Sequence, residues 1–181
     1  MSNRPYIASA LATLILSVSA CAATPTDRSS GQAVDDSTVE VKAKTALIEN
    51  PVTKAYKIDL EVYKGQVQLN GFVDTAAEKQ AAAETVQKIA GVKSVQNNLQ
   101  VQPHDRTSGQ YVDDSTITAK VKSALIADDR TKAYQIEVKT NMGEVQLGGF
   151  VDSPAAKKAA QEVAQTVTGV KSVTNSLDVK N

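Results

Sequence analysis

The sequence predicts an α+β protein made of two tandem copies of one small domain. The same segment occurs at 65–74 (GQVQLNGFVD) and at 143–152 (GEVQLGGFVD), and the offset of 143 − 65 = 78 residues continues without a gap on both sides. Each segment alternates apolar and polar residues, as a half-buried strand does. With its flanks, each copy is predicted as an αββαβ unit: a three-stranded mixed sheet with two helices on one face.

Composition argues against a nucleic-acid partner. The 181 residues carry 20 basic and 20 acidic side chains, so the formal net charge is zero. A neutral chain lacks the basic footprint on which nucleic-acid binding depends. Aromatic residues make up only 4%, which leaves few platforms for stacking bases.

The first residues, 1–20, are predicted to be a signal peptide. Arg4 supplies the positive end, and an apolar run follows at 7–18. This run is too short to span a bilayer and has the form of a cleaved export segment.

The only cysteine lies where cleavage is expected. Ser19, Ala20 and Cys21 resemble the lipobox of bacterial lipoproteins, although Val18 replaces the commoner leucine. The resemblance implies that Cys21 carries acyl chains such as palmitate, and several chains anchor a protein stably. The alternative is an ordinary signal peptide followed by an unmodified thiol. Ala22 replaces the aspartate that retains lipoproteins at the inner membrane, which favours the periplasmic face of the outer membrane.

The mature chain divides into a polar tether at 21–30, a first domain at 31–102, a linker at 103–108 and a second domain at 109–181. Each domain is predicted to open with a helix that starts at an Asp-Ser pair, Asp36-Ser37 or Asp114-Ser115. Oxygen acceptors at a helix start bond its free amides, so capping is the expected role of Asp36 and Asp114. The buried stripes are predicted to be Val39, Ala43, Ala46 and Leu47, matched by Ile117, Val121, Ala124 and Leu125.

A hairpin and a crossover complete each domain. Lys64-Gly65 and 141–143 are predicted hairpin turns, because glycine supplies the positive φ that such turns need. The second helices are expected to start at Thr75 and at Ser153-Pro154. The last strands, 92–101 and 170–179, are expected to return parallel to the 65–74 and 143–152 strands through a right-handed crossover.

Few residues suit catalysis or metal binding. The single histidine, His104, falls in the linker, and Cys21 is assigned to lipid, so neither provides a nucleophile–base pair within a domain. Asp35-Asp36 and Asp113-Asp114 are read as helix caps rather than metal ligands. We therefore expect no enzyme activity, no cofactor and no metal site.

Phe72 and Phe150 are the only phenylalanines and occupy equivalent positions on the polar face of the central strand. One hypothesis is that this face is where the domains meet each other or a partner, with these rings as anchors. The other is that each ring folds over its own sheet. Asn97 and Asn175 interrupt an apolar strand face, and their expected role is structural.

Three spaced motifs resemble the BON domain family. They are Asp-Asp-Ser-Thr with its helix, Gly-x-Val-x-Leu-x-Gly-x-Val, and Gly-Val-Lys-Ser-Val-x-Asn-x-Leu-x-Val, and they occur in both copies. The resemblance implies a non-catalytic protein that binds phospholipid or envelope partners and supports outer-membrane integrity under stress, such as osmotic stress.

The resemblance also implies where lipid would bind. Anionic phospholipid is expected on the helix of the second domain, with Ile117 at the membrane and Lys120 and Lys122 reaching head groups. Thr116 stands where lipid-binding relatives carry an aromatic residue, and Tyr111 supplies one nearby. A periplasmic chaperone-like or scaffolding role for exported proteins is the alternative, and a passive spacer is a third reading. The oligomeric state does not follow from the sequence.

Overall fold

The computed structural model describes residues 29–53, 58–102, 108–131 and 136–180. The predictions for the signal peptide, for Cys21 and most of the tether, and for His104 lie outside these residues.

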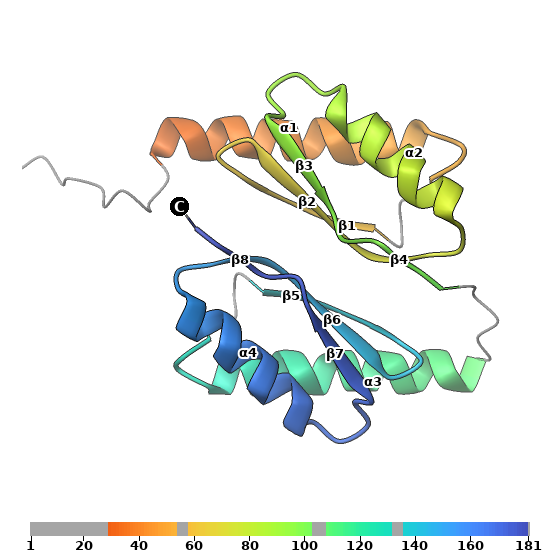
Figure 1. The fold of residues 1–181 in the computed structure, drawn as a ribbon, viewed down its shortest axis with the longest axis vertical. Coiled ribbons are helices and arrows are strands. Elements are labelled where there is room, and N and C mark those ends of the chain that lie inside the picture. The colour runs from red at the N-terminus through yellow and green to blue at the C-terminus, as the bar shows by residue number, and fades with distance from the viewer. Residues whose placement is uncertain (1–28, 54–57, 103–107, 132–135, 181) are drawn as a thin grey trace, which may run out of the picture.

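Each copy contains a long helix, a hairpin, a second helix and a final strand in two pieces (Figure 1). The first copy consists of α1 (Ser30–Glu49), β1 (Ile58–Tyr63), β2 (Gln66–Val73), α2 (Ala76–Gln87), β3 (Ser94–Asn97) and β4 (Gln100–Val101). The second consists of α3 (Ser108–Ala127), β5 (Ile136–Asn141), β6 (Glu144–Val151), α4 (Pro154–Thr166), β7 (Ser172–Asn175) and β8 (Asp178–Val179). The predicted α+β fold with two tandem αββαβ domains is confirmed.

The central strand of each sheet is the repeated segment. In the first domain β1 runs antiparallel to β2, with Ile58 opposite Gly71, while β3 and β4 both run parallel to β2 on its other side. The two pieces are the predicted last strand with an interruption. Asn97 shapes the break, since its amide donates to the carbonyl of Lys79 (2.8 Å) and its Oδ1 accepts from the amide of Leu99 (3.3 Å).

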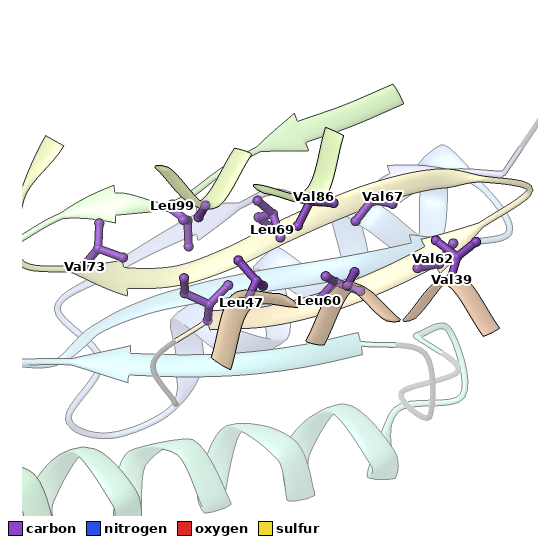
Figure 2. Close-up of a cluster of buried hydrophobic side chains, with 12 residues drawn as sticks. Val39, Leu47, Leu60, Val62, Val67, Leu69, Val73, Val86 and Leu99 are labelled. Atoms are coloured by element: carbon purple, nitrogen blue, oxygen red, sulfur yellow. The ribbon is translucent and has the colours of Figure 1, made fainter. Parts of the chain in front are cut away.

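The helices cover one face of each sheet and bury an aliphatic core beneath them. Figure 2 shows the core of the first domain: Val39 and Leu47 from α1, Leu60 and Val62 from β1, Val67, Leu69 and Val73 from β2, Val86 from α2, and Leu99. Leu47, Leu60, Leu69 and Leu99 are at most 1% exposed. Full burial of such a side chain stabilises the fold by about 1.5–3 kcal/mol, so this core holds the first domain together, and an equivalent cluster of the second domain does the same there.

The predicted start of the first helix is wrong. α1 begins at Ser30, and Ser29 is its N-cap in a capping box with Gln32. Asp36 therefore lies inside the helix and is buried, 4% exposed. Its two carboxylate oxygens accept from the amides of Lys64 and Gly65, both at 2.8 Å. Asp36 caps the hairpin turn rather than its own helix.

The second domain repeats this arrangement. Asp114 is buried within α3, and its carboxylate accepts from the amides of Met142 (2.8 Å) and Gly143 (2.9 Å). Met142 and Gly143 have φ of 50° and 82°, a left-handed turn that directs successive amides toward one acceptor. The predicted starts of the other two helices are correct: Thr75 caps α2, and Ser153 caps α4 with Pro154 in its first turn.

The two sheets pack face to face. In Figure 1 the helices of both domains lie outermost, and the sheets lie between them in the centre. The polar side of β2 contacts the polar side of β6, and buries Gln68, Asn70 and Gln146 to 2% exposure or less. The molecule is thus a four-layer sandwich in which each sheet has helices on one face and the other sheet on the second.

Candidate functional site

Two glutamines cross the interface between the domains in a reciprocal way. Gln146 Oε1 accepts from the amide of Gly71 (2.7 Å), and Gln68 Oε1 accepts from the amide of Gly149 (2.9 Å). The two bonds are equivalent under the repeat, so an approximate twofold axis relates the domains. The side-chain amide of Gln146 also donates to the carbonyl of Asn98 (2.7 Å). The side-chain oxygens of both glutamines are paired across the interface, which favours one register between the sheets, whereas Nε2 of Gln68 is buried without a partner among the described residues.

Both phenylalanines are buried next to this interface. The ring of Phe150 lies 5.3 Å from the ring of Tyr63, which belongs to the other domain. Such a pair adds about 0.5–1.5 kcal/mol beyond the area it buries. Phe72 is 5% exposed. Phe150 therefore contacts the other domain rather than only its own sheet.

Charged residues of β1 and β5 meet across the interface, but not symmetrically. Lys139 forms an ion pair with Asp59 (3.1 Å). The repeat places Glu61 where Lys139 stands and Glu137 where Asp59 stands, so the second location holds two carboxylates. Glu137 is paired with Lys122 of α3 (3.2 Å). The pKa of Glu61 is raised to about 7, first by burial and then by the neighbouring carboxylates of Glu40 and Glu137, which outweigh the lowering by Lys44.

Replacing Glu61 by glutamine should make the protein more stable in mildly alkaline solution. Because the folded-state pKa of Glu61 lies above 4.5, the folded protein binds more protons than the unfolded chain between pH 4.5 and about 7. Stability contributed by this group therefore falls as the pH rises through that window. Since Glu61 is half-buried and partly screened, we expect a gain of about 1–2 kcal/mol at pH 8 and little at pH 4.

Urea unfolding of wild type and Glu61→Gln across this pH range measures the difference. Glu49→Gln, which removes an exposed carboxylate of α1 in the same domain, is the control. If Glu61→Gln raises the free energy of unfolding equally at pH 4 and pH 8, the pKa of Glu61 is not raised in the folded protein.

The predicted lipid-binding residues separate into three groups. Tyr111, Thr116 and Lys120 lie exposed on the side of α3 that faces away from the core. Ile117 is 8% exposed and belongs to the core, where it packs against Gly169. Lys122 lies beside β5 in its ion pair with Glu137. The expectation that Ile117 touches the membrane is therefore wrong, because its side chain points into the domain.

The outer side of α3 contains apolar residues that the prediction missed. Val112 and Ile126 are 62% and 73% exposed, and Ala119 lies between them at heptad spacing. A shallow hollow over this outer side is lined by Tyr111, Val112, Ser115, Thr116, Ala119, Lys120 and Ser123. A surface helix normally places charged residues opposite its buried stripe. The spacing 112, 119, 126, out of phase with the core stripe 117, 121, 125, was the available sequence signal.

The first helix has a similar outer side. Val34, Val41 and Ile48 are 66%, 65% and 72% exposed and correspond to Val112, Ala119 and Ile126 under the repeat. α1 has no aromatic residue on this side, since Ala33 takes the position of Tyr111. The two outer sides belong to opposite layers of the sandwich (Figure 1).

Within the described ranges, no three His, Cys, Asp or Glu side chains are arranged to hold a metal ion. Over the same ranges, none of the helices combines the length and the apolar content that crossing a bilayer demands.

A duplicated αββαβ domain with a split last strand and a hairpin capped from its first helix defines the class of this protein. The chain belongs to the BON family: the BON domain model matches residues 35–103 and 113–181. It is similar to the osmotically-inducible protein Y of Escherichia coli, with 36% identity over 83% of this chain and 75% of that protein. It is also similar to the outer membrane lipoprotein DolP of Haemophilus influenzae and a 21 kDa hemolysin of Actinobacillus pleuropneumoniae. Each is 35% identical over 81% of this chain and 75% of the relative.

Proposed function

We propose that this protein is a lipid-anchored, non-catalytic protein of the outer membrane that contacts anionic phospholipid and supports the envelope under stress. The names of two relatives, one an outer membrane lipoprotein and one osmotically inducible, support the location and the role. The lipobox-like segment ending at Cys21 supports the anchor. A mature chain whose mass lacks acyl groups would contradict the anchor.

The observation that carries the phospholipid contact is the outer side of α3. Val112 and Ile126 are exposed there, and Tyr111 and Lys120 flank them. On a bilayer, the aliphatic side chains and the ring would enter the boundary between head groups and acyl chains. Lys120 would reach the anionic head groups, which contributes about 1 kcal/mol. Ile117 and Lys122 would support the helix from its inner side, through the core and through Glu137.

Replacing Ile126 by glutamate should weaken binding to anionic vesicles about tenfold or more, because the change removes an inserted apolar group and adds a repelled charge. Co-sedimentation of the unlipidated mature chain with vesicles of equal parts phosphatidylglycerol and phosphatidylethanolamine, at low salt, measures the effect.

The repeat offers a matched control in α1. Ile48→Glu makes the same change at the equivalent and equally exposed position, and should leave binding close to wild type. Two results would refute the α3 contact. One is the absence of wild-type binding at low salt, where screening is weakest. The other is an equal loss in the Ile48 and Ile126 variants.

A further inference from the structure

A polar groove lies at the edge of the sandwich, between the two sheets. Within the described part of the chain β3 pairs only with β2, so its other edge is open. A groove of about 360 Å³ follows this edge and is lined by Gln66, Ser94, Val95, Gln96, Asp178 and Val179. The first four residues come from the first domain and the last two from β8 of the second. The groove therefore exists only when the domains are packed together.

Two oxygen acceptors in this groove lack partners. Gln96 Oε1 is buried and accepts no hydrogen bond. Asp178 is only half-buried, and its carboxylate makes neither an ion pair nor a side-chain hydrogen bond with another described residue. Buried polar atoms are nearly always paired, so an unpaired one that lines a groove indicates a missing donor. A ligand that fits the groove must therefore supply N–H groups. A positively charged group on that ligand would also be attracted to the carboxylate of Asp178.

The backbone of β3 offers further bonding groups. The amide of Lys93 donates to the carbonyl of Gly65 (2.8 Å), toward the interior of the sheet. The amide of Asn98 also donates inward, to the carbonyl of Leu69 (2.9 Å), and Gln96 lies opposite Gln68 of β2. Because alternate residues of a parallel strand bond to one neighbour, Gln96 and Asn98 bond to β2, and the backbone amide and carbonyl of Val95 face the open edge. An open edge of this kind is a template for another strand.

We propose that this groove binds an extended polypeptide segment that adds to the edge of β3 and carries a basic side chain opposite Asp178. The segment's amides would meet the carbonyls of β3 and Gln96 Oε1, which is the chemistry of strand addition. The polar lining does not suit an acyl chain, and the acceptors would repel a phosphate. This binding is separate from the phospholipid contact on α3 and does not depend on it.

Although the domain is repeated, we expect only one such groove in each chain, because the residues that line it differ between the two copies. The positions equivalent to Gln96 and Asp178 are Thr174 and Gln100. Thr174 is exposed, so the second domain has no buried acceptor there, and Gln100 carries no charge.

Fluorescence anisotropy with a labelled peptide of alternating valine and lysine, added to the full mature chain, tests the proposal. Gln96→Leu should weaken binding about tenfold, because it removes the acceptor, and Thr174→Leu should leave binding unchanged. Gln96→Leu should not lower stability, since the oxygen it removes has no partner to lose. Asp178→Asn should weaken the binding of the valine–lysine peptide, because it removes the charge opposite the lysines. A valine–glutamate peptide should bind poorly to the wild type for the same reason.

Backbone chemistry separates strand addition from simple charge attraction. The valine–lysine peptide N-methylated at alternate amides keeps its charge but cannot pair with a strand edge, and should lose most of its affinity. Bound peptide should slow hydrogen exchange at the amide of Val95, which faces the open edge. The proposal is overturned if no peptide binds, if the N-methylated peptide binds as well as its parent, or if the Gln96 and Thr174 variants behave alike.

Discussion

Replacing Asp114 by alanine should lower the free energy of unfolding by about 3 kcal/mol, because one buried carboxylate holds two backbone amides of the β5–β6 turn. Without it, the amides of Met142 and Gly143 lose a charged acceptor. Water can replace the carboxylate only in part, because the hydrogen bond that it accepts from the amide of Gly143 is buried. Asp114→Asn keeps one acceptor oxygen and should fall between alanine and wild type.

The neighbouring residue provides the control for this prediction. Asp113 has the same side chain one position earlier and is exposed, so Asp113→Ala should change stability by less than about 0.5 kcal/mol. Denaturant unfolding measures the energies, and hydrogen exchange at Met142 and Gly143 locates the effect. If Asp114→Ala lowers the free energy of unfolding no more than Asp113→Ala does, the carboxylate of Asp114 does not stabilise the β5–β6 hairpin.

The same aspartates show where reasoning from sequence succeeds and where it fails. The period of two in 65–74, the turn glycine at Gly65 and the Ser153-Pro154 start are local signals, and each predicted its element correctly. Asp36-Ser37 also gives a local signal, that of a helix cap. The signal misled because the hairpin that uses the carboxylate lies 28 and 29 residues away, and such a long-range partner leaves no mark in the spacing.

The candidate site depends on the same distinction. The sequence places Lys120 and Tyr111 on the outer side of α3, whereas Ile117 belongs to the apolar stripe 117, 121, 125 and is buried, so a membrane contact for Ile117 conflicts with its own stripe. The groove at β3 could not be predicted, since Gln96 and Asp178 meet only when the two domains pack. Contacts across a domain interface follow from the tertiary arrangement, which an internal repeat alone does not specify.

Replacing Gly148 by asparagine should disrupt the packing of the two domains, although it restores the residue that the first repeat has at this position. Gly148 corresponds to Asn70, and the two lie against each other near the approximate twofold axis. A Cβ atom at 148 would sit 2.4 Å from Nδ2 and 2.5 Å from Cγ of Asn70, well inside contact distance. The space holds one asparagine, so we expect a loss of about 2–3 kcal/mol as the sheets separate to admit a second.

Exchanging the two residues tests whether space or backbone conformation decides. Asn70→Gly combined with Gly148→Asn moves the single asparagine to the position that the approximate twofold axis relates to residue 70. The double variant should therefore regain most of the lost stability. Small-angle scattering should show the single variant Gly148→Asn more extended than wild type and the double variant compact again. Rescue of this kind is a coupling between the two positions, which additive effects cannot produce. If Gly148→Asn alone stays compact and stable, or if the double variant is no better than the sum of the two single changes, the sheets are not held in the register that Gln68 and Gln146 indicate.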